Sequence, residues 1–145
     1  MKNTRRSLLA ALGLLLLKPL AALAAWNQEA FGAKSAGDAL KNLGAASPAP
    51  SKDIVIEAPQ IAENGAVVPI EISSNIPGTS SIAVLIEKNP FPLTGKFDFK
   101  EGALPFVKLN VKMGETSEVR VIALAGGKSF VATREIKVTI GGCGG

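Results

Sequence analysis

The stretch "SEVRVIALAGGKSFVATREIKVTI", Ser117 to Ile140, contains two strand-like segments joined by a pair of glycines. In the second segment, alternate side chains divide between two faces, with Ala132, Arg134, Ile136, Val138 and Ile140 on one and Val131, Thr133, Glu135, Lys137 and Thr139 on the other. Such alternation is typical of a half-buried strand. Gly126-Gly127 is a signal for a tight hairpin, in which the backbone must adopt positive φ. The stretch therefore predicts a long antiparallel hairpin.

Similar short strands, separated by turns, account for the chain from Asp53 onward. They are expected at Ile54 to Ala58, Ala66 to Ser73, Ser81 to Glu87, Leu93 to Phe99, Phe106 to Met113, Ser117 to Ala125 and Lys128 to Ile140. Asn64-Gly65 is a second signal for a tight hairpin. About seven strands with regular turns predict an immunoglobulin-like antiparallel β-sandwich over residues 53–140. The chain has one cysteine, so the inter-sheet disulfide of antibody domains is excluded.

The segment before the sandwich, Trp26 to Gly44, predicts one helix. Its apolar residues recur at steps of three and four, and Gly44 stands where a helix C-cap is common. We expect this helix to dock on the sandwich through Trp26, Leu40 and Leu43. A loosely ordered arm remains an alternative, because Gly32 and Gly37 weaken a helix. A Pro- and Ser-containing linker, residues 46–52, completes the region 25–52.

Residues 1–24 have the pattern of a cleaved export signal. A basic start is followed by an apolar run over residues 8–17 and by a small-x-small site at Ala22-Leu23-Ala24. The paired Arg5 and Arg6 are typical of the twin-arginine pathway, with ordinary secretion as the alternative. The pattern predicts an exported protein.

Export of this kind changes the charge balance of the protein. The chain has 16 Lys and Arg against 12 Asp and Glu, and four of the basic residues lie in the signal. The mature chain is therefore nearly neutral. Its composition gives no support for nucleic acid or a membrane surface as a partner.

The final five residues, Gly141, Gly142, Cys143, Gly144 and Gly145, are here called the tail. Strand pairing should hold the chain down to about Ile140, and the glycines should leave the tail mobile, because ordering glycine costs the most conformational entropy. An extended chain would carry the Cys143 backbone about 10 Å beyond the last fixed residue. Its thiol could therefore enter a narrow pocket of another protein.

The chain offers no chemistry of its own to activate this thiol. It contains no histidine, which excludes an imidazole base and an imidazole metal ligand. We find no metal motif and no phosphate loop, and we expect no cofactor. Lys137 is the nearest basic residue in sequence, and the following carboxylate disfavours the thiolate. The chain is predicted not to be an enzyme, and the reactions should belong to whatever protein receives the tail.

Several functions remain open at this point. The cysteine could be incidental or could form only an intermolecular disulfide, as in an exported immunoglobulin-like binding or structural subunit. A ubiquitin-like carrier loaded at its terminal Gly-Gly is disfavoured by the export signal. An enzyme would require turnover by this chain alone. We favour a covalent handle for a small substrate that passes between enzymes, with Cys143 as the point of attachment.

The sequence resembles the Y subunit of the bacterial sulfur-oxidising (Sox) system, the sulfur carrier of thiosulfate oxidation. The resemblance is carried by Arg5-Arg6, "AKSAGDALKNLG", "IEKNPFPL" from Ile86 to Leu93, and above all by the tail. It implies that Cys143 bears the sulfur and that Gly141, Gly142, Gly144 and Gly145 form a swinging arm.

The resemblance also implies a location in the periplasm and a set of partners. A smaller Z subunit would form a heterodimer with this chain. A haem c enzyme would join thiosulfate to the tail cysteine, a manganese hydrolase would release sulfate, and a molybdenum-haem sulfur dehydrogenase would oxidise the remaining sulfur.

"KNPFPL", Lys88 to Leu93, predicts a break between strands. Pro90 and Pro92 cannot donate backbone hydrogen bonds, so the segment should end one strand and begin an edge strand. We expect Phe91 to cover the core. It could also contact a partner subunit.

Overall fold

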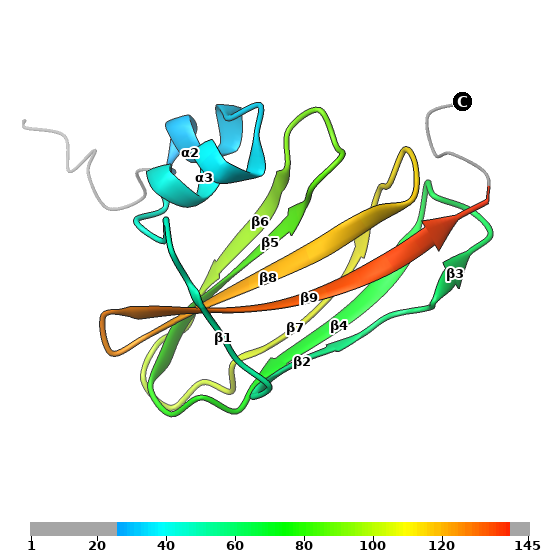
Figure 1. Ribbon diagram of the computed structural model, residues 1–145. Helices are drawn as coiled ribbons and strands as arrows, with labels where there is room; N and C mark the ends of the chain where they lie inside the picture. The colour runs from blue at the N-terminus through cyan, green and yellow to red at the C-terminus, as the bar shows by residue number, and fades with distance from the viewer. Residues whose placement is uncertain (1–25, 140–145) are drawn as a thin grey trace, which may run out of the picture.

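The computed structural model describes residues 26–139, which form two β-sheets packed face to face, with two short helices on one side (Figure 1). The helices are α2 (Gln28–Gly32) and α3 (Ala36–Asn42). The strands are β1 (Ala49–Pro50), β2 (Ile54–Glu57), β3 (Ile61–Ala62), β4 (Val68–Ser74), β5 (Thr79–Ile86), β6 (Leu93–Asp98), β7 (Phe106–Val111), β8 (Ser117–Ala125) and β9 (Lys128–Val138). The mainly β class and all seven expected strands are confirmed.

The strand order is immunoglobulin-like. The larger sheet has the order β1-β9-β8-β5-β6, with β3 also on β9, and the smaller sheet has the order β2-β4-β7. If the seven main strands are lettered in chain order, these sheets correspond to the GFC and ABE strands of that fold, with β6 beside the C strand. Neighbouring main strands are antiparallel throughout.

The hairpin between β8 and β9 forms as predicted. Gly126 and Gly127 have φ of 55° and 74°, and pairing continues from Ala125↔Lys128 to Ser117↔Ile136. The prediction of a hairpin at Asn64-Gly65 was wrong. The strands on its two sides pair elsewhere, β3 with β9 and β4 with β2 and β7. Asn64 instead accepts a hydrogen bond from the amide of Ala66 through its side chain, 2.9 Å away, and so forms a local turn.

The main core lies between the two sheets. Alternate residues of β4, Val68, Ile70 and Ile72, are fully buried and face the inward residues of β5, β8 and β9. β5 is buried on both faces. Its Ile82, Val84 and Ile86 join the inter-sheet core, while Ala83 and Leu85 pack under the helices. A layer of helix on the outer face of β5 therefore explains why this strand is apolar without alternation.

The N-terminal segment forms two helices, so the single helix predicted over Trp26 to Gly44 was wrong. Ala33 has an extended backbone (ψ 139°), and Ser35 caps the second helix by accepting a hydrogen bond from the amide of Asp38. A serine with this ability favours a new helix start over continuation. Gly44 has φ of 72° directly after α3, as a C-terminal glycine should.

The helices dock on the larger sheet through part of the predicted set. Leu40 is buried and Leu43 packs against the same cluster, which confirms both. Trp26 does not dock. Its side chain is 66% exposed and stacks on Phe31, with ring centroids 5.1 Å apart.

Two short strands that were not predicted lie on the outer edge of β9, both parallel to it. Ala49–Pro50 pairs with Phe130 and Val131, and Ile61–Ala62 pairs with Lys137 and Val138. β9 is the longest strand and would otherwise leave a long row of unpaired backbone groups. These two segments cover both ends of that edge (Figure 1).

The segment Lys88 to Leu93 separates β5 from the edge strand β6, as predicted. Phe91 does not cover the core: it is 49% exposed, and Lys34 Nζ lies 3.5 Å from its ring centroid. The ring thus links the sandwich to the loop between the helices by a cation-π contact.

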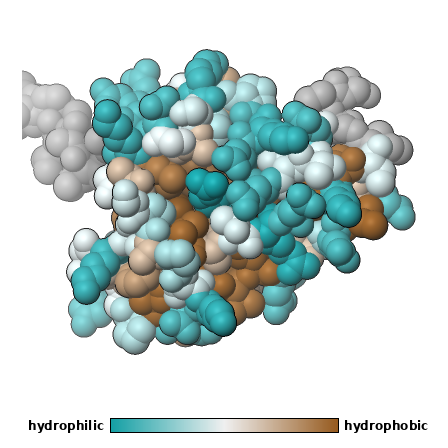
Figure 2. All heavy atoms as spheres, in the orientation of Figure 1, coloured by the Kyte–Doolittle hydropathy of each residue, from teal (hydrophilic) through white to brown (hydrophobic). Residues whose placement is uncertain are grey.

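In the surface view, hydrophilic residues predominate in the upper part and hydrophobic residues gather in the lower half (Figure 2).

Candidate functional site

The predicted attachment residue, Cys143, and the four glycines around it lie outside the described residues. The structure describes the chain that leads to them, which is the end of β9 and Thr139. We call Lys137, Val138 and Thr139 the root of the tail.

The root is fixed on one side by β3. The amide of Lys137 donates to the carbonyl of Gln60 (3.0 Å), and the amide of Thr139 donates to the carbonyl of Ala62 (3.1 Å). The Thr139 hydroxyl lies 3.4 Å from the carbonyl of Glu63. Parallel pairing with β3 therefore holds the backbone as far as Thr139, close to the limit at Ile140 that the sequence predicted.

The other side of the root is fixed by a side chain. Pairing between β8 and β9 ends at Ser117↔Ile136, so Val138 has no strand partner on that side. The Thr116 hydroxyl fills this place and accepts a hydrogen bond from the amide of Val138 at 2.9 Å. No sequence pattern pointed to Thr116 or to β3, because each acts through a contact with a residue far away in the chain.

A groove lies at the same end of the sandwich as the root. It has a volume of about 510 Å³ and lies between the β5–β6 and β7–β8 connections. We call it the lysine groove; its lining residues are Lys88, Asn89, Pro90, Lys112, Gly114 and Glu115. The Asn89 amide donates to the carbonyl of Lys112 at 2.8 Å and so joins the two sheets across the groove.

A second charged cluster lies near the start of β8. Arg120 Nη2 lies 3.2 Å from Glu118 and 3.5 Å from Glu87. Burial raises the pKa of the Glu118 carboxyl. The hydrogen bond from Arg120 and the charge of its guanidinium oppose this effect, and the pKa lies below its ordinary value of 4.5. The arrangement keeps Glu118 ionised as a structural partner of Arg120.

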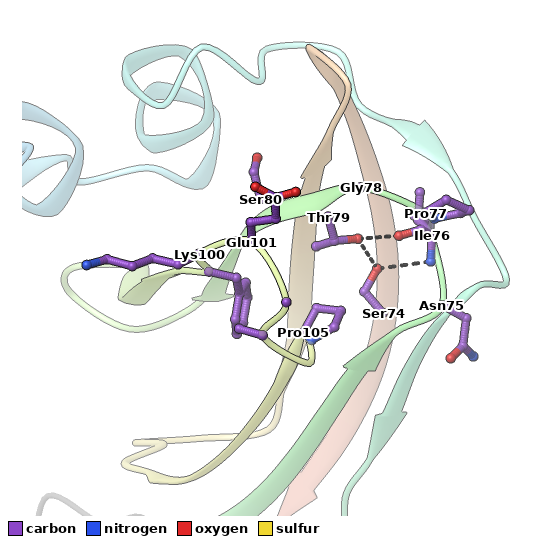
Figure 3. A pocket seen from close by; sticks show the side chains of 13 residues that line it. Ser74, Asn75, Ile76, Pro77, Gly78, Thr79, Ser80, Lys100, Glu101 and Pro105 are labelled. Atoms are coloured by element: carbon purple, nitrogen blue, oxygen red, sulfur yellow. Dashed lines mark hydrogen bonds between the residues drawn. The ribbon is translucent and has the colours of Figure 1, made fainter.

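A cavity at the opposite end of the sandwich does not belong to this site. It has a volume of about 450 Å³ between the β4–β5 and β6–β7 connections, at the end where the β8–β9 hairpin turns. Its hydroxyls bond to one another and to nearby backbone: Ser74 Oγ and Thr79 Oγ1 are 2.7 Å apart, and Thr79 Oγ1 donates to the carbonyl of Ile76 (Figure 3). These contacts stabilise the turn.

Within residues 26–139, no group of three acidic, histidine or cysteine side chains is placed to hold a metal ion. No helix in that range is long and apolar enough to cross a bilayer.

Comparison with known proteins decides the family. The model of the family described as "Sulfur oxidation protein SoxY" matches residues 40–143. The chain belongs to the SoxY family. A solved structure of the sulfur carrier protein SoxY from Chlorobium limicola f. thiosulfatophilum is 37% identical, with a TM-score of 0.67, and the match covers 79% of this chain and all of that one. The SoxY match extends through Cys143, so the predicted attachment residue lies inside the family pattern.

Other comparisons add nothing to the SoxY assignment. An engineered protein is 14% identical with a TM-score of 0.42 over 60% of this chain and 20% of its own length. The bacterial superantigen toxic shock syndrome toxin-1 is 15% identical with a TM-score of 0.40 over 59% of this chain and 98% of that one. Both values are too low to support an inference about this SoxY protein. A search of the curated proteins gave no significant match.

Proposed function

We propose that this SoxY protein is a periplasmic, non-catalytic carrier that holds thiosulfate-derived sulfur on Cys143 and presents it to successive Sox enzymes. The observation that carries the proposal is the SoxY match, which runs to residue 143, together with 37% identity to a protein named a sulfur carrier. The export pattern in residues 1–24 supports the compartment.

The proposed reactions need partner enzymes that use water and accept the electrons released. The Cys143 thiol and thiosulfate form a sulfur–sulfur bond, release a proton and give an electron pair to a haem c enzyme. Water then displaces the outer sulfonate as sulfate on a manganese hydrolase and leaves a persulfide on Cys143. A molybdenum-haem dehydrogenase oxidises the outer sulfur of this persulfide with oxygen from water and removes the electrons.

The fixed root supports a carrier role. Backbone amides of the root donate hydrogen bonds to carbonyls at β3 and to the Thr116 hydroxyl, which anchors the backbone up to Thr139. An attached group could then travel only on the residues that follow, so the sandwich would remain unchanged while different enzymes receive the tail. We propose Gly141, Gly142, Gly144 and Gly145 as this arm, since glycine gives the backbone its greatest conformational range.

A Z-type subunit is the proposed stable partner. Phe91 is a candidate contact because its ring is half exposed beside the edge strand β6. A partner placed there would also cover an open strand edge.

The test is Cys143→Ser in a reconstituted thiosulfate-oxidising system. We expect turnover to be lost, with the circular dichroism spectrum and any heterodimer unchanged. Intact mass spectrometry of protein from cells grown on thiosulfate should show sulfur or thiosulfate adducts that a reductant removes. Turnover retained by the serine variant, with only free thiol and simple dimers in the mass spectrum, would instead support an exported binding subunit.

A further inference from the structure

The Asn64-Gly65 pair, which does not form a hairpin, is placed for a chemical change of its own. Asn64 is exposed, and it is the one asparagine of the chain that is followed by glycine. A glycine in the next position lets its backbone nitrogen approach the asparagine side chain, because it has no β-carbon to obstruct the approach. The pair therefore has the residue types in which a backbone nitrogen can attack a side-chain amide.

The side chain of Asn64 is held only through its oxygen. Oδ1 accepts the hydrogen bond from the amide of Ala66 at 2.9 Å. In the described part of the chain Nδ2 has no hydrogen-bond partner, whereas the side-chain nitrogens of Asn27, Asn42 and Asn89 each donate to a backbone carbonyl. The bond to Oδ1 draws electrons from Cγ and would stabilise negative charge on the oxygen during an attack. The amino group is free to leave.

The attacking nitrogen belongs to Gly65, which is buried. Its carbonyl accepts a hydrogen bond from the amide of Met113 at 2.7 Å, but over residues 26–139 its own N–H has no acceptor. A buried N–H without a partner costs free energy. Bonding of this nitrogen to Cγ of Asn64 would give a ring in which it carries no hydrogen, so ring closure would remove the unpaired donor.

We propose that Asn64 is a site of spontaneous conversion to aspartate and isoaspartate through a cyclic succinimide. The Gly65 nitrogen, having lost its proton to hydroxide, bonds to Cγ of Asn64. The bond from Cγ to Nδ2 breaks, and the leaving nitrogen takes a proton from water and departs as ammonia. Water then opens the ring at Cγ to give aspartate, or at the main-chain carbonyl to give isoaspartate. The step needs no oxidant and does not depend on the carrier function.

The isoaspartate form would act on the root of the tail. The backbone is held on both sides of Asn64: the carbonyl of Ala62 accepts from the amide of Thr139 at 3.1 Å, and the carbonyl of Gly65 accepts from Met113, which is fully buried. In isoaspartate the backbone runs through the side chain and is longer by one atom, so the two contacts cannot both keep their geometry. The contact with exposed Thr139 should yield, because Met113 is packed in the core.

The first test is incubation of the folded mature chain at about pH 8.5 and about pH 6, followed by peptide mass spectrometry. We expect residue 64 to gain the mass difference between a hydroxyl and an amino group, faster at the higher pH, and to become a substrate for an isoaspartate methyltransferase. Asn64→Gln should abolish both signals, because glutamine would have to form a larger ring. Asn110→Gln is the matched control at an exposed asparagine followed by valine and should leave both unchanged. Conversion that occurs only in guanidinium-unfolded protein, or equally at Asn110, would overturn the proposal.

The second test is hydrogen exchange of the isoaspartate form after its separation from the parent chain. The amide of Thr139 should exchange faster, while that of Val138 should not change, because Thr116 still accepts its hydrogen bond. Asn64→Asp adds the charge without lengthening the backbone and should leave the exchange of Thr139 as it is in the parent. Unchanged exchange at Thr139 in the isoaspartate form would show that the effect on the root is wrong.

Discussion

At the scale of single residues, Glu118 shows how a charge near the start of β8 is fixed by its neighbours. Hydrogen bonds and the charge of Arg120 lower its pKa below 4.5 despite burial. A lowered pKa means that the ionised form stabilises the fold above the unfolded pKa, and this contribution is lost as the pH falls through the folded value. We expect Glu118→Gln to lower the free energy of unfolding at pH 7 by less than about 1 kcal/mol, because the pair is partly exposed.

Urea unfolding from pH 7 down to pH 3 measures this effect. The difference between the two proteins should be largest at neutral pH and should shrink below pH 4.5. About 1 M salt should reduce it at pH 7, since screening weakens a partly exposed pair. A difference that grows on acidification would contradict the assignment.

At the scale of elements, the end of β9 depends on a side chain where the sheet ends. Thr116→Val keeps the shape of residue 116 but removes the acceptor for the amide of Val138. We expect hydrogen exchange at Val138 to become faster, and the free energy of unfolding to fall by about 1 kcal/mol. Thr94→Val is the matched control, because its hydroxyl makes only a 3.4 Å contact on the edge strand β6. Equal exchange in all three proteins would show that β3 alone fixes the root.

At the scale of the whole molecule, stability and carrier function are expected to reside in separate residues. Ile136 is fully buried between the sheets, so Ile136→Ala should lower the free energy of unfolding by about 2–5 kcal/mol. Deleting residues 141–145 should leave the thermal midpoint unchanged, because both buried clusters of the described chain lie between residues 30 and 136. Calorimetry of the two variants checks this. A clear fall in midpoint on deletion would show that the tail contributes to the fold.

The sequence by itself determined the features that depend on local pattern. Alternation with a period of two located the main strands, and Gly126-Gly127 predicted the hairpin because few other residues adopt positive φ twice in succession. The tail was predicted as the site from residue type alone, which needs no tertiary contact.

Only the tertiary structure decided which distant segments of the chain lie beside one another. β1 and β3 are too short to show a pattern, and they exist because the edge of β9 offers unpaired backbone groups. Thr116 and the lysine groove depend on contacts between residues far apart in sequence, as does the contact of Lys34 with Phe91. Local periodicity reports which face of a strand is buried, but it carries no information about which distant segment covers that strand's edge.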